Sequence, residues 1–333
     1  MVLAMHQAFG EKSSIITLYE SLDQYKGKSV HCVDKSNTFD IYATMRLYKK
    51  ILTGGYTVVH CHLSSFMHVL PIIILIRLLR IDVIYTLHNL AEYDVGYNRM
   101  KIRLFQFLSD MKLVKFVTIS PEVTNSFERL IKRKPYCQIY NGVDVDHPAN
   151  KIASEKSDVF NMVCVANFKE QKRHDRLLQI AASLIGELKF HLYLVGDGSL
   201  KQDSIELAKK LGLSDLVTFT GSVSCPKKFY EKSDIFVLAS DFEGHPLSVL
   251  EAMSHGLPVV STPAGGVSSI IQDPETGFIC KDVESFRKTI LRLAADPYLL
   301  NTVGRAARFR VQNVFSEEVM ISNYRSLYEN SLL

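Results

Sequence analysis

Apolar runs of strand length alternate with helical patterns along the whole 333-residue chain. The runs are continuously apolar, which is typical of strands that are buried on both faces of a sheet. This alternation predicts parallel, doubly wound α/β sheets with helices on both faces. The strands predicted in the first half are residues 2–5, 29–33, 57–60, 83–86, 116–119 and 137–140, and the helices between them are residues 15–22, 41–52, 67–79, 100–111 and 121–131.

The second half of the chain repeats this alternation. Its predicted strands are residues 162–165, 190–195, 217–220, 235–239, 258–261 and 277–280, and its predicted helices are residues 173–188, 200–211, 227–231, 248–254 and 283–294. The chain is long enough for two domains that each have an ample core. Two such domains imply a cleft between them, and ligands of doubly wound sheets bind beyond the carboxyl ends of the strands.

A polar stretch, residues 147–158, separates the two halves. It lacks apolar periodicity and has Pro148 near its start, as expected for a linker. We therefore expect an N-terminal domain over residues 1–150 and a C-terminal domain over residues 151–315. Residues 316–333 open with a serine N-cap and two glutamates, which predicts an amphipathic helix that packs back towards the N-terminal domain.

Two glutamates eight positions apart follow the predicted strand at residues 235–239. Glu243 falls in the loop after that strand and Glu251 in the next helix, and backbone N–H groups at such a helix start bind anions well. Either glutamate alone is most simply a solvated side chain. The two glutamates together fit the pattern Glu-Gly-x-Pro-Leu-x-x-x-Glu-Ala-Met-x-x-Gly-x-Pro-Val-Val. This combination indicates carboxylates that accept hydrogen bonds from ligand hydroxyls. Gly265 and Gly266 predict a turn nearby in which two backbone segments approach each other closely.

This pattern resembles the paired-glutamate, nucleotide-sugar signature of the retaining glycosyltransferases of family four, which have the GT-B fold. The resemblance implies two Rossmann-like doubly wound domains that face each other across a cleft. It extends over nearly the whole chain and is weakest in the first 25 residues. Its further motifs are His60-Cys61-His62, Thr86-Leu87-His88, the turn at Ser120, Asn141-Gly142-Val143-Asp144 and the strand-loop over residues 165–172.

The resemblance assigns roles to residues of both domains. It implies that Glu243 binds hydroxyls of the donor sugar, that Glu251 binds the ribose hydroxyls, and that Lys172 stabilises charge on the diphosphate leaving group. His88 would contact the donor sugar or assist the acceptor hydroxyl, although a lone histidine at a strand end is more often a packed residue. The other donor-binding positions are Gly244, His245 and Leu247 after Glu243, Gly196 and Ser222 at the following strand ends, and Asn167 and Lys169 beside Lys172.

The chain departs from the family pattern at three positions. Asn167 stands where the family usually has an arginine, and Lys169 either supplies the missing charge or is a solvated lysine. His245 stands where an aromatic or aliphatic residue is common, which leaves the preferred donor sugar open. Ser269 stands where the family usually has an acid, and no role is carried over to it.

We expect no metal or other cofactor. The chain has no Asp-x-Asp at a strand end that resembles a divalent-metal site, and its six cysteines form no Cys-x-x-Cys pair. His60 and His62 face the same way because a strand has a period of two, but no further metal ligands are evident, so we interpret them as structural. The resemblance implies a metal-independent reaction with retention, in which the acceptor attacks the face that the diphosphate leaves.

The balance of 39 basic against 35 acidic residues, without a nucleic-acid-binding motif, argues against a nucleic-acid partner.

The most apolar run, residues 69–79, is shorter than the ~20 residues of a spanning helix and predicts a buried helix instead. Basic residues of the first domain and an apolar stripe predict peripheral attachment to the anionic cytoplasmic face of a membrane. The alternative is that the helix over residues 100–111 buries this stripe in its domain. The basic residues are Lys101, Arg103, Lys112, Lys115, Arg129, Lys132, Arg133 and Lys134, and the stripe consists of Ile102, Leu104, Phe105, Phe107 and Leu108.

These observations predict a cytoplasmic, hexosyltransferase-type glycosyltransferase that moves a sugar from a nucleotide donor to an acceptor hydroxyl. We expect the donor to be a UDP-sugar. By analogy the acceptor is a glycan or lipid-linked glycan of a surface polysaccharide such as lipopolysaccharide, capsule or exopolysaccharide. Two alternatives remain open: a transferase with a small soluble acceptor, of the sucrose or trehalose type, and an inactive nucleotide-sugar-binding module. An oxidoreductase would need a Gly-x-Gly-x-x-Gly turn after a strand, and the chain has none.

Overall fold

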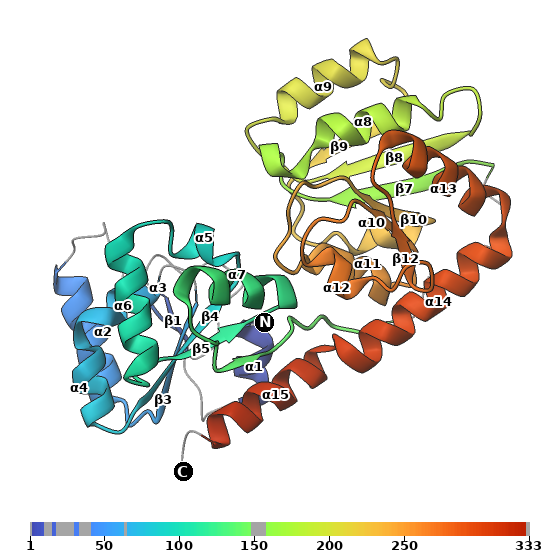
Figure 1. The fold of residues 1–333 in the computed structure, drawn as a ribbon. Helices are drawn as coiled ribbons and strands as arrows, with labels where there is room; N and C mark the ends of the chain where they lie inside the picture. Colours follow the sequence, from blue (N-terminus) through green and yellow to red (C-terminus); the bar gives the residue numbers. More distant parts are fainter. Residues whose placement is uncertain are drawn as a thin grey trace. The chain divides into compact units, whose positions relative to one another are not determined.

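The computed structural model describes residues 2–9, 15–17, 30–32, 41–62, 65–147 and 158–330. The chain forms two compact units, one of Met1–Tyr140 with Glu317–Leu333 and one of Asn141–Ser316. Each unit contains a parallel sheet with helices packed on it (Figure 1), so the predicted α/β class is confirmed. Most of the predicted linker, including the expected boundary at residue 150, lies outside the described residues.

The main sheet of the first unit has four parallel strands in the order β3-β4-β5-β6. These are β3 (Val58–His62), β4 (Asp82–Leu87), β5 (Lys115–Thr118) and β6 (Cys137–Gln138). Two further strands, β1 (Ile15–Thr17) and β2 (Val30–Cys32), pair in parallel with each other. Every residue of β4 is buried, which accounts for the unbroken apolar run that predicted this strand.

The helices of this unit cover both faces of its main sheet. One face packs on a core that includes Tyr85, Phe105 and Phe116, and α1 and α15 cover the other through Met5 and Tyr324 (Figure 1). The C-terminal helix is thus an integral part of the first unit. The helices are α1 (Val2–Phe9), α2 (Ile41–Thr53), α3 (Ser65–Val69), α4 (Ile73–Leu78), α5 (Ala91–Asp94), α6 (Arg99–Asp110), α7 (Pro121–Ile131) and α15 (Glu317–Glu329).

Two predictions near the N-terminus are wrong. Residues 2–5, predicted as a strand, lie in α1, where the ring of Phe9 packs at a tilt against that of Tyr328, with 5.3 Å between the ring centres. Residues 15–22, predicted as a helix, begin as β1, and the remainder lies outside the described residues. In both places packing against a distant segment overrides the short local pattern, and the β-branched residues of β1 are well suited to a strand.

The predicted helix over residues 67–79 is divided. A 3₁₀ turn, Leu70–Ile72, separates α3 from α4, because Pro71 cannot donate a backbone hydrogen bond and interrupts the α-helical ladder. No helix among the described residues combines the length and the apolar character that are needed to cross a membrane.

The apolar stripe predicted along α6 belongs mainly to the core. Phe105 and Leu108 are buried in the first-unit core, Ile102 and Leu104 pack against it, and Phe107 is half exposed. Several of the basic residues named with the stripe pair with acids: Lys115 with Asp82, Arg129 with Glu92 and Arg133 with Asp110. The alternative interpretation of this helix, burial of its stripe in the domain, is therefore confirmed.

The second unit has six parallel strands in the order β12-β11-β10-β7-β8-β9. The order reverses on either side of β7, as expected for a doubly wound sheet. The strands are β7 (Phe160–Val165), β8 (Phe190–Val195), β9 (Val217–Gly221), β10 (Ile235–Leu238), β11 (Val259–Ser261) and β12 (Gly277–Ile279). The helices are α8 (His174–Ala182), α9 (Lys201–Lys210), α10 (Lys227–Lys232), α11 (Leu247–Ser254), α12 (Val267–Ile270), α13 (Val283–Ala295) and α14 (Pro297–Val314).

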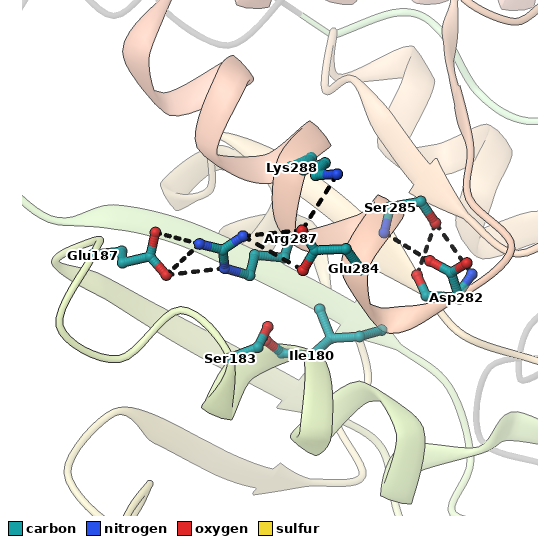
Figure 2. Close-up of polar contacts among 8 residues, drawn as sticks. All are labelled: Ile180, Ser183, Glu187, Asp282, Glu284, Ser285, Arg287 and Lys288. Carbon is teal, nitrogen blue, oxygen red and sulfur yellow. Dashed lines mark hydrogen bonds and ion pairs between the residues drawn. The ribbon is translucent and has the colours of Figure 1, made fainter.

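Two helices of this unit show how local caps and distant contacts combine. Asp282 and Ser285 form a capping box at the start of α13 (Figure 2). Arg287 of that helix donates hydrogen bonds to Glu284 and to Glu187, and its Nε lies 2.9 Å from Glu187 Oε1. Helix α14 was not predicted. It packs on α11, and it approaches the turn after α11 so closely that a Cβ at Gly304 would lie 2.1 Å from the Gly256 carbonyl oxygen.

Candidate active site

Lys172 and Glu243 meet at the carboxyl ends of two neighbouring strands. Lys172 ends a 3₁₀ turn after β7, and Glu243 lies in the loop after β10, which pairs directly with β7. Lys172 Nζ donates to both carboxylate oxygens of Glu243 at 2.7 Å. The side chains are only 17% and 6% exposed, so the charges are nearly desolvated and neutralise each other. Two residues that the sequence predicted separately thus form one buried ion pair.

Further groups hold the Glu243 loop in place. Ser240 Oγ donates to Glu243 Oε1 at 2.7 Å, and Thr262 Oγ1 donates to the Ser240 carbonyl oxygen. Gly266 N donates to the Glu243 carbonyl oxygen at 2.8 Å, and a Cβ at Gly266 would lie only 1.8 Å from the carbonyl oxygen of Gly244. The predicted close-approach turn is confirmed, and the backbone it approaches is that of the Glu243 loop. Sequence reasoning missed Ser240, although a serine at the end of an apolar strand was a usable signal.

Glu251 lies on α11 and accepts a hydrogen bond from a buried tyrosine. Tyr230 OH donates to Glu251 Oε2 at 2.8 Å from helix α10. Burial raises the pKa of Glu251, and the hydrogen bond from Tyr230 acts in the opposite direction. Sequence reasoning missed Tyr230, because the periodicity of a short helix does not indicate which distant side chain its hydroxyl will meet.

The loop before α11 points its histidine into the protein. His245 is 5% exposed, and its ring lies 5.4 Å from that of Phe315 in an edge-on arrangement. Burial lowers the pKa of His245 to about 3, so the ring is neutral at neutral pH. Asn141 Nδ2 donates to the His245 carbonyl oxygen at 3.4 Å. Leu247, the first residue of α11, is 41% exposed.

The remaining predicted donor-binding residues lie at the ends of β7, β8 and β9. Asn167 and Ser222 are exposed, and a Cβ at Gly196 would lie 2.1 Å from the Ala166 carbonyl oxygen, so that position requires glycine. Lys169 is exposed and lines a cavity of about 380 Å³ to which Lys172, Glu243 and Glu251 do not contribute. Lys169 also precedes the 3₁₀ turn that ends at Lys172, and Lys172 N donates to the Lys169 carbonyl oxygen at 3.0 Å.

Three histidines gather at the carboxyl ends of β3 and β4 in the first unit. The rings of His60 and His62 lie 4.1 Å apart, which confirms that they share one face of the strand. His62 Nδ1 and His88 Nε2 are hydrogen-bonded at 2.9 Å. His60 bonds Thr86 Oγ1 at 2.7 Å and Tyr328 OH of α15 at 2.6 Å.

Their surroundings keep these histidines uncharged. Burial lowers the pKa of His88 to about 4 and that of His60 to about 3, and burial together with the neighbouring histidines lowers the pKa of His62. At neutral pH each ring can therefore donate through one nitrogen and accept through the other. The cluster provides neutral hydrogen-bonding groups, in contrast to the ion pair of the second unit.

Comparison with known proteins identifies the family. The sequence model described as Glycosyltransferase Family 4 matches residues 15–147, and that described as Glycosyl transferases group 1 matches residues 159–296. The chain belongs to glycosyltransferase family four. It is therefore a glycosyltransferase, and its two α/β units are the two domains of the GT-B fold.

Curated relatives of this glycosyltransferase act on different acceptors. It is 27% identical over 263 residues to N-acetyl-alpha-D-glucosaminyl L-malate synthase of Bacillus anthracis, covering 76% of this chain and 69% of the relative. It is 26% identical over 321 residues to the UDP-Gal:alpha-D-GlcNAc-diphosphoundecaprenol alpha-1,3-galactosyltransferase of Escherichia coli, covering 89% and 81%.

Solved structures support the fold. A glycosyltransferase from Rickettsia africae superposes with a TM-score of 0.82 at 17% identity, covering 99% of this chain and 93% of the other. The Anabaena protein Alr3699/HepE, solved in complex with UDP-glucose, superposes with a TM-score of 0.82 at 16% identity, covering 99% and 94%.

Proposed function

We propose that this glycosyltransferase transfers a sugar from a UDP-linked donor to an acceptor hydroxyl with retention of anomeric configuration. The buried ion pair of Lys172 and Glu243 carries the proposal. An ammonium group held in a water-poor site is suited to stabilise charge that develops on a diphosphate leaving group. Glu243, anchored by Ser240, is suited to accept hydrogen bonds from the hydroxyls of the donor sugar.

Glu251 is suited to bind the two ribose hydroxyls of the nucleotide. Tyr230 OH donates to one of its carboxylate oxygens, which restrains the carboxylate and leaves the other oxygen available to a ligand hydroxyl. His88, neutral and hydrogen-bonded to His62, is the proposed partner of the donor sugar or of the acceptor hydroxyl. We propose that no metal takes part, so that activity persists in EDTA, and restoration by Mg²⁺ after chelation would contradict this.

The relatives support the choice of donor and acceptor. The Escherichia coli relative is named for UDP-galactose and an acceptor on diphosphoundecaprenol, and the Anabaena structure contains UDP-glucose. We propose a lipid-linked glycan of a surface polysaccharide as the acceptor, used at the cytoplasmic face of a membrane. The Bacillus anthracis relative, named for a glucosaminyl malate, favours the second candidate, a transferase with a small soluble acceptor.

A panel of nucleotide sugars tests the donor. Binding to the folded protein raises its melting temperature, and we expect UDP-sugars to stabilise it more than GDP- or ADP-sugars. Glu251→Gln is the matched variant, because it should reduce the stabilisation by nucleotides. The absence of stabilisation by every UDP-sugar would contradict the proposed donor, and stabilisation without transfer to any acceptor would favour the inactive binding module. Retention is tested by the anomeric proton coupling of the product.

A further inference from the structure

Apart from Arg77, which pairs with Asp82, helix α4 consists of apolar residues, yet one side of it is exposed. Ile73 and Ile76 are buried in the first-unit core, whereas Ile74 is 62% exposed and Leu78 is 74% exposed. Exposed aliphatic side chains on a helix that is almost entirely apolar usually indicate a surface that a partner covers. The turn that follows adds Leu79, which is 51% exposed. The outer side of this helix therefore has the composition of a buried surface.

Helix α2, which packs on the same core, also has exposed apolar residues. Leu47 and Ile51 of α2 belong to the same core cluster as the buried isoleucines of α4, so both helices cover the same face of the first sheet (Figure 1). On α2, Ile41 is 72% exposed, Tyr42 82% and Met45 61%. We name the exposed apolar residues of the two helices and the following turn the α2–α4 face; it consists of Ile41, Tyr42, Met45, Ile74, Leu75, Leu78 and Leu79.

The net charge of this segment is positive, although Arg77 pairs with Asp82, which directly follows it. Residues 41–81 contain five basic residues and no aspartate or glutamate. Lys49 of α2 and Arg80 after α4 are exposed, so part of this charge lies at the surface. Apolar side chains bordered by positive charge are complementary to an anionic phospholipid bilayer, which offers an apolar interior beneath negative headgroups. A second copy of the chain would bring like charges together, which opposes a symmetric dimer through this face.

We propose that the α2–α4 face docks onto an anionic phospholipid membrane. Its leucines and isoleucines would enter the interfacial region, Tyr42 would lie at the headgroup level, and Lys49 and Arg80 would meet lipid phosphates. The inference rests on the proposed lipid-linked acceptor, because docking would hold the first unit at the surface where such a glycan is presented. It assigns the membrane contact to α2 and α4 instead of the α6 stripe, which is mainly buried.

Co-sedimentation of the full chain with vesicles tests the docking surface. We expect binding to phosphatidylcholine vesicles that contain phosphatidylglycerol, weakened by high salt, and little binding to phosphatidylcholine alone. Ile74→Asp with Leu78→Asp should weaken binding at least about tenfold, because both apolar contacts are lost. Lys49→Ala with Arg80→Ala should weaken it by about fivefold per charge and reduce its salt dependence.

Matched variants separate this surface from others. Phe107→Asp with Met111→Asp changes exposed apolar residues of α6 and of the position that follows it, and Tyr298→Asp changes one of α14. Both variants should bind vesicles like the wild type. The proposal is overturned if the wild type does not bind at low salt, if the Ile74 and Leu78 variant binds unchanged, or if the α6 variant alone loses binding. A concentration-dependent dimer that this α4 variant dissociates would also overturn it. Stabilisation by UDP-sugars, measured on each variant, reports the proposed donor function independently and confirms folding.

Discussion

The two units place polar side chains at strand ends in electrically different ways. In the first unit, His60, His62 and His88 lie together in surroundings that hold them uncharged. In the second unit, Lys172 and Glu243 are both charged and neutralise each other. Neutral side chains can replace their mutual hydrogen bonds by hydrogen bonds to a ligand at little electrostatic cost. In a buried ion pair, by contrast, each charge needs a new partner when a ligand separates the two. The second arrangement suits a charged ligand such as the proposed nucleotide diphosphate, and the first suits hydroxyl groups.

The largest effect is expected from breaking the ion pair. Lys172→Ala should lower kcat/KM by about 30- to 1000-fold, or ~2–4 kcal/mol, because a fixed cation is lost from the transition state. It should also lower the free energy of unfolding by about 3 kcal/mol, since Glu243 is left buried without its partner. Steady-state kinetics and denaturant unfolding measure the two effects.

A double variant separates activity from stability. Lys172→Met with Glu243→Gln removes both charges, so the free energy of unfolding should recover while activity stays low. Wild-type stability in the single Lys172→Ala variant would show that the pair is not effectively buried. A wild-type melting temperature without activity in the double variant would show that the charges of the second unit serve catalysis and are not required for its stability.

The two glutamates should differ in kinetic character. Glu243→Gln is expected to lower kcat about a hundredfold, because its proposed contact is with the reacting sugar. Glu251→Gln is expected to raise the donor KM about tenfold, because its proposed contact is with the ribose, away from the bond that breaks. Initial rates over a range of donor concentrations distinguish the two. Equal and negligible effects would contradict the assignment of both residues.

The pH dependence tests the neutral cluster of the first unit. Burial lowers the pKa of His88 to about 4, so the neutral form persists as pH falls, and kcat should show no limb near the ordinary histidine pKa of about 6.5. His62→Ala should admit water, raise the pKa of His88 and introduce such a limb. A wild-type limb near pH 6.5 that His88→Asn removes would refute this. The free energy of unfolding should also depend on pH. Below about pH 6.5 the histidines are protonated in the unfolded chain but remain neutral in the folded one. Acidification should therefore lower the free energy of unfolding by about 1 kcal/mol per pH unit for each such histidine.

The smallest effect is expected from replacing Tyr230, the uncharged hydrogen-bond partner of Glu251. Tyr230→Phe should raise the donor KM about five- to tenfold with little change in kcat, because it removes one hydrogen bond from a carboxylate. It should also raise the pKa of Glu251 further, so that donor KM begins to increase at a higher pH on acidification. In a Glu251→Gln background the same change should have little further effect. Additive losses would show that Tyr230 acts only through packing.

Prediction from the sequence succeeded where local signals and burial agree. Strand β8 and helix α7 have the predicted bounds, since one is a continuous apolar run and the other begins with a serine cap followed by proline. It failed at α1 and β1, whose conformations depend on packing against distant segments. It also missed α14, although Asp296 and Pro297 provide a recognisable start.

The sequence by itself determined the fold class, the family and the charged groups available for chemistry, because these depend on residue type and spacing within single strand-loop-helix units. Only the tertiary structure decided which groups meet. Lys172 reaches Glu243 because β10 pairs with β7, and Tyr230 reaches Glu251 because α10 and α11 bring their side chains together. Burial, which sets the charge state of His88, is likewise a property of the assembled unit. Strand order and helix contacts join residues far apart in the chain, and no local pattern encodes those distances.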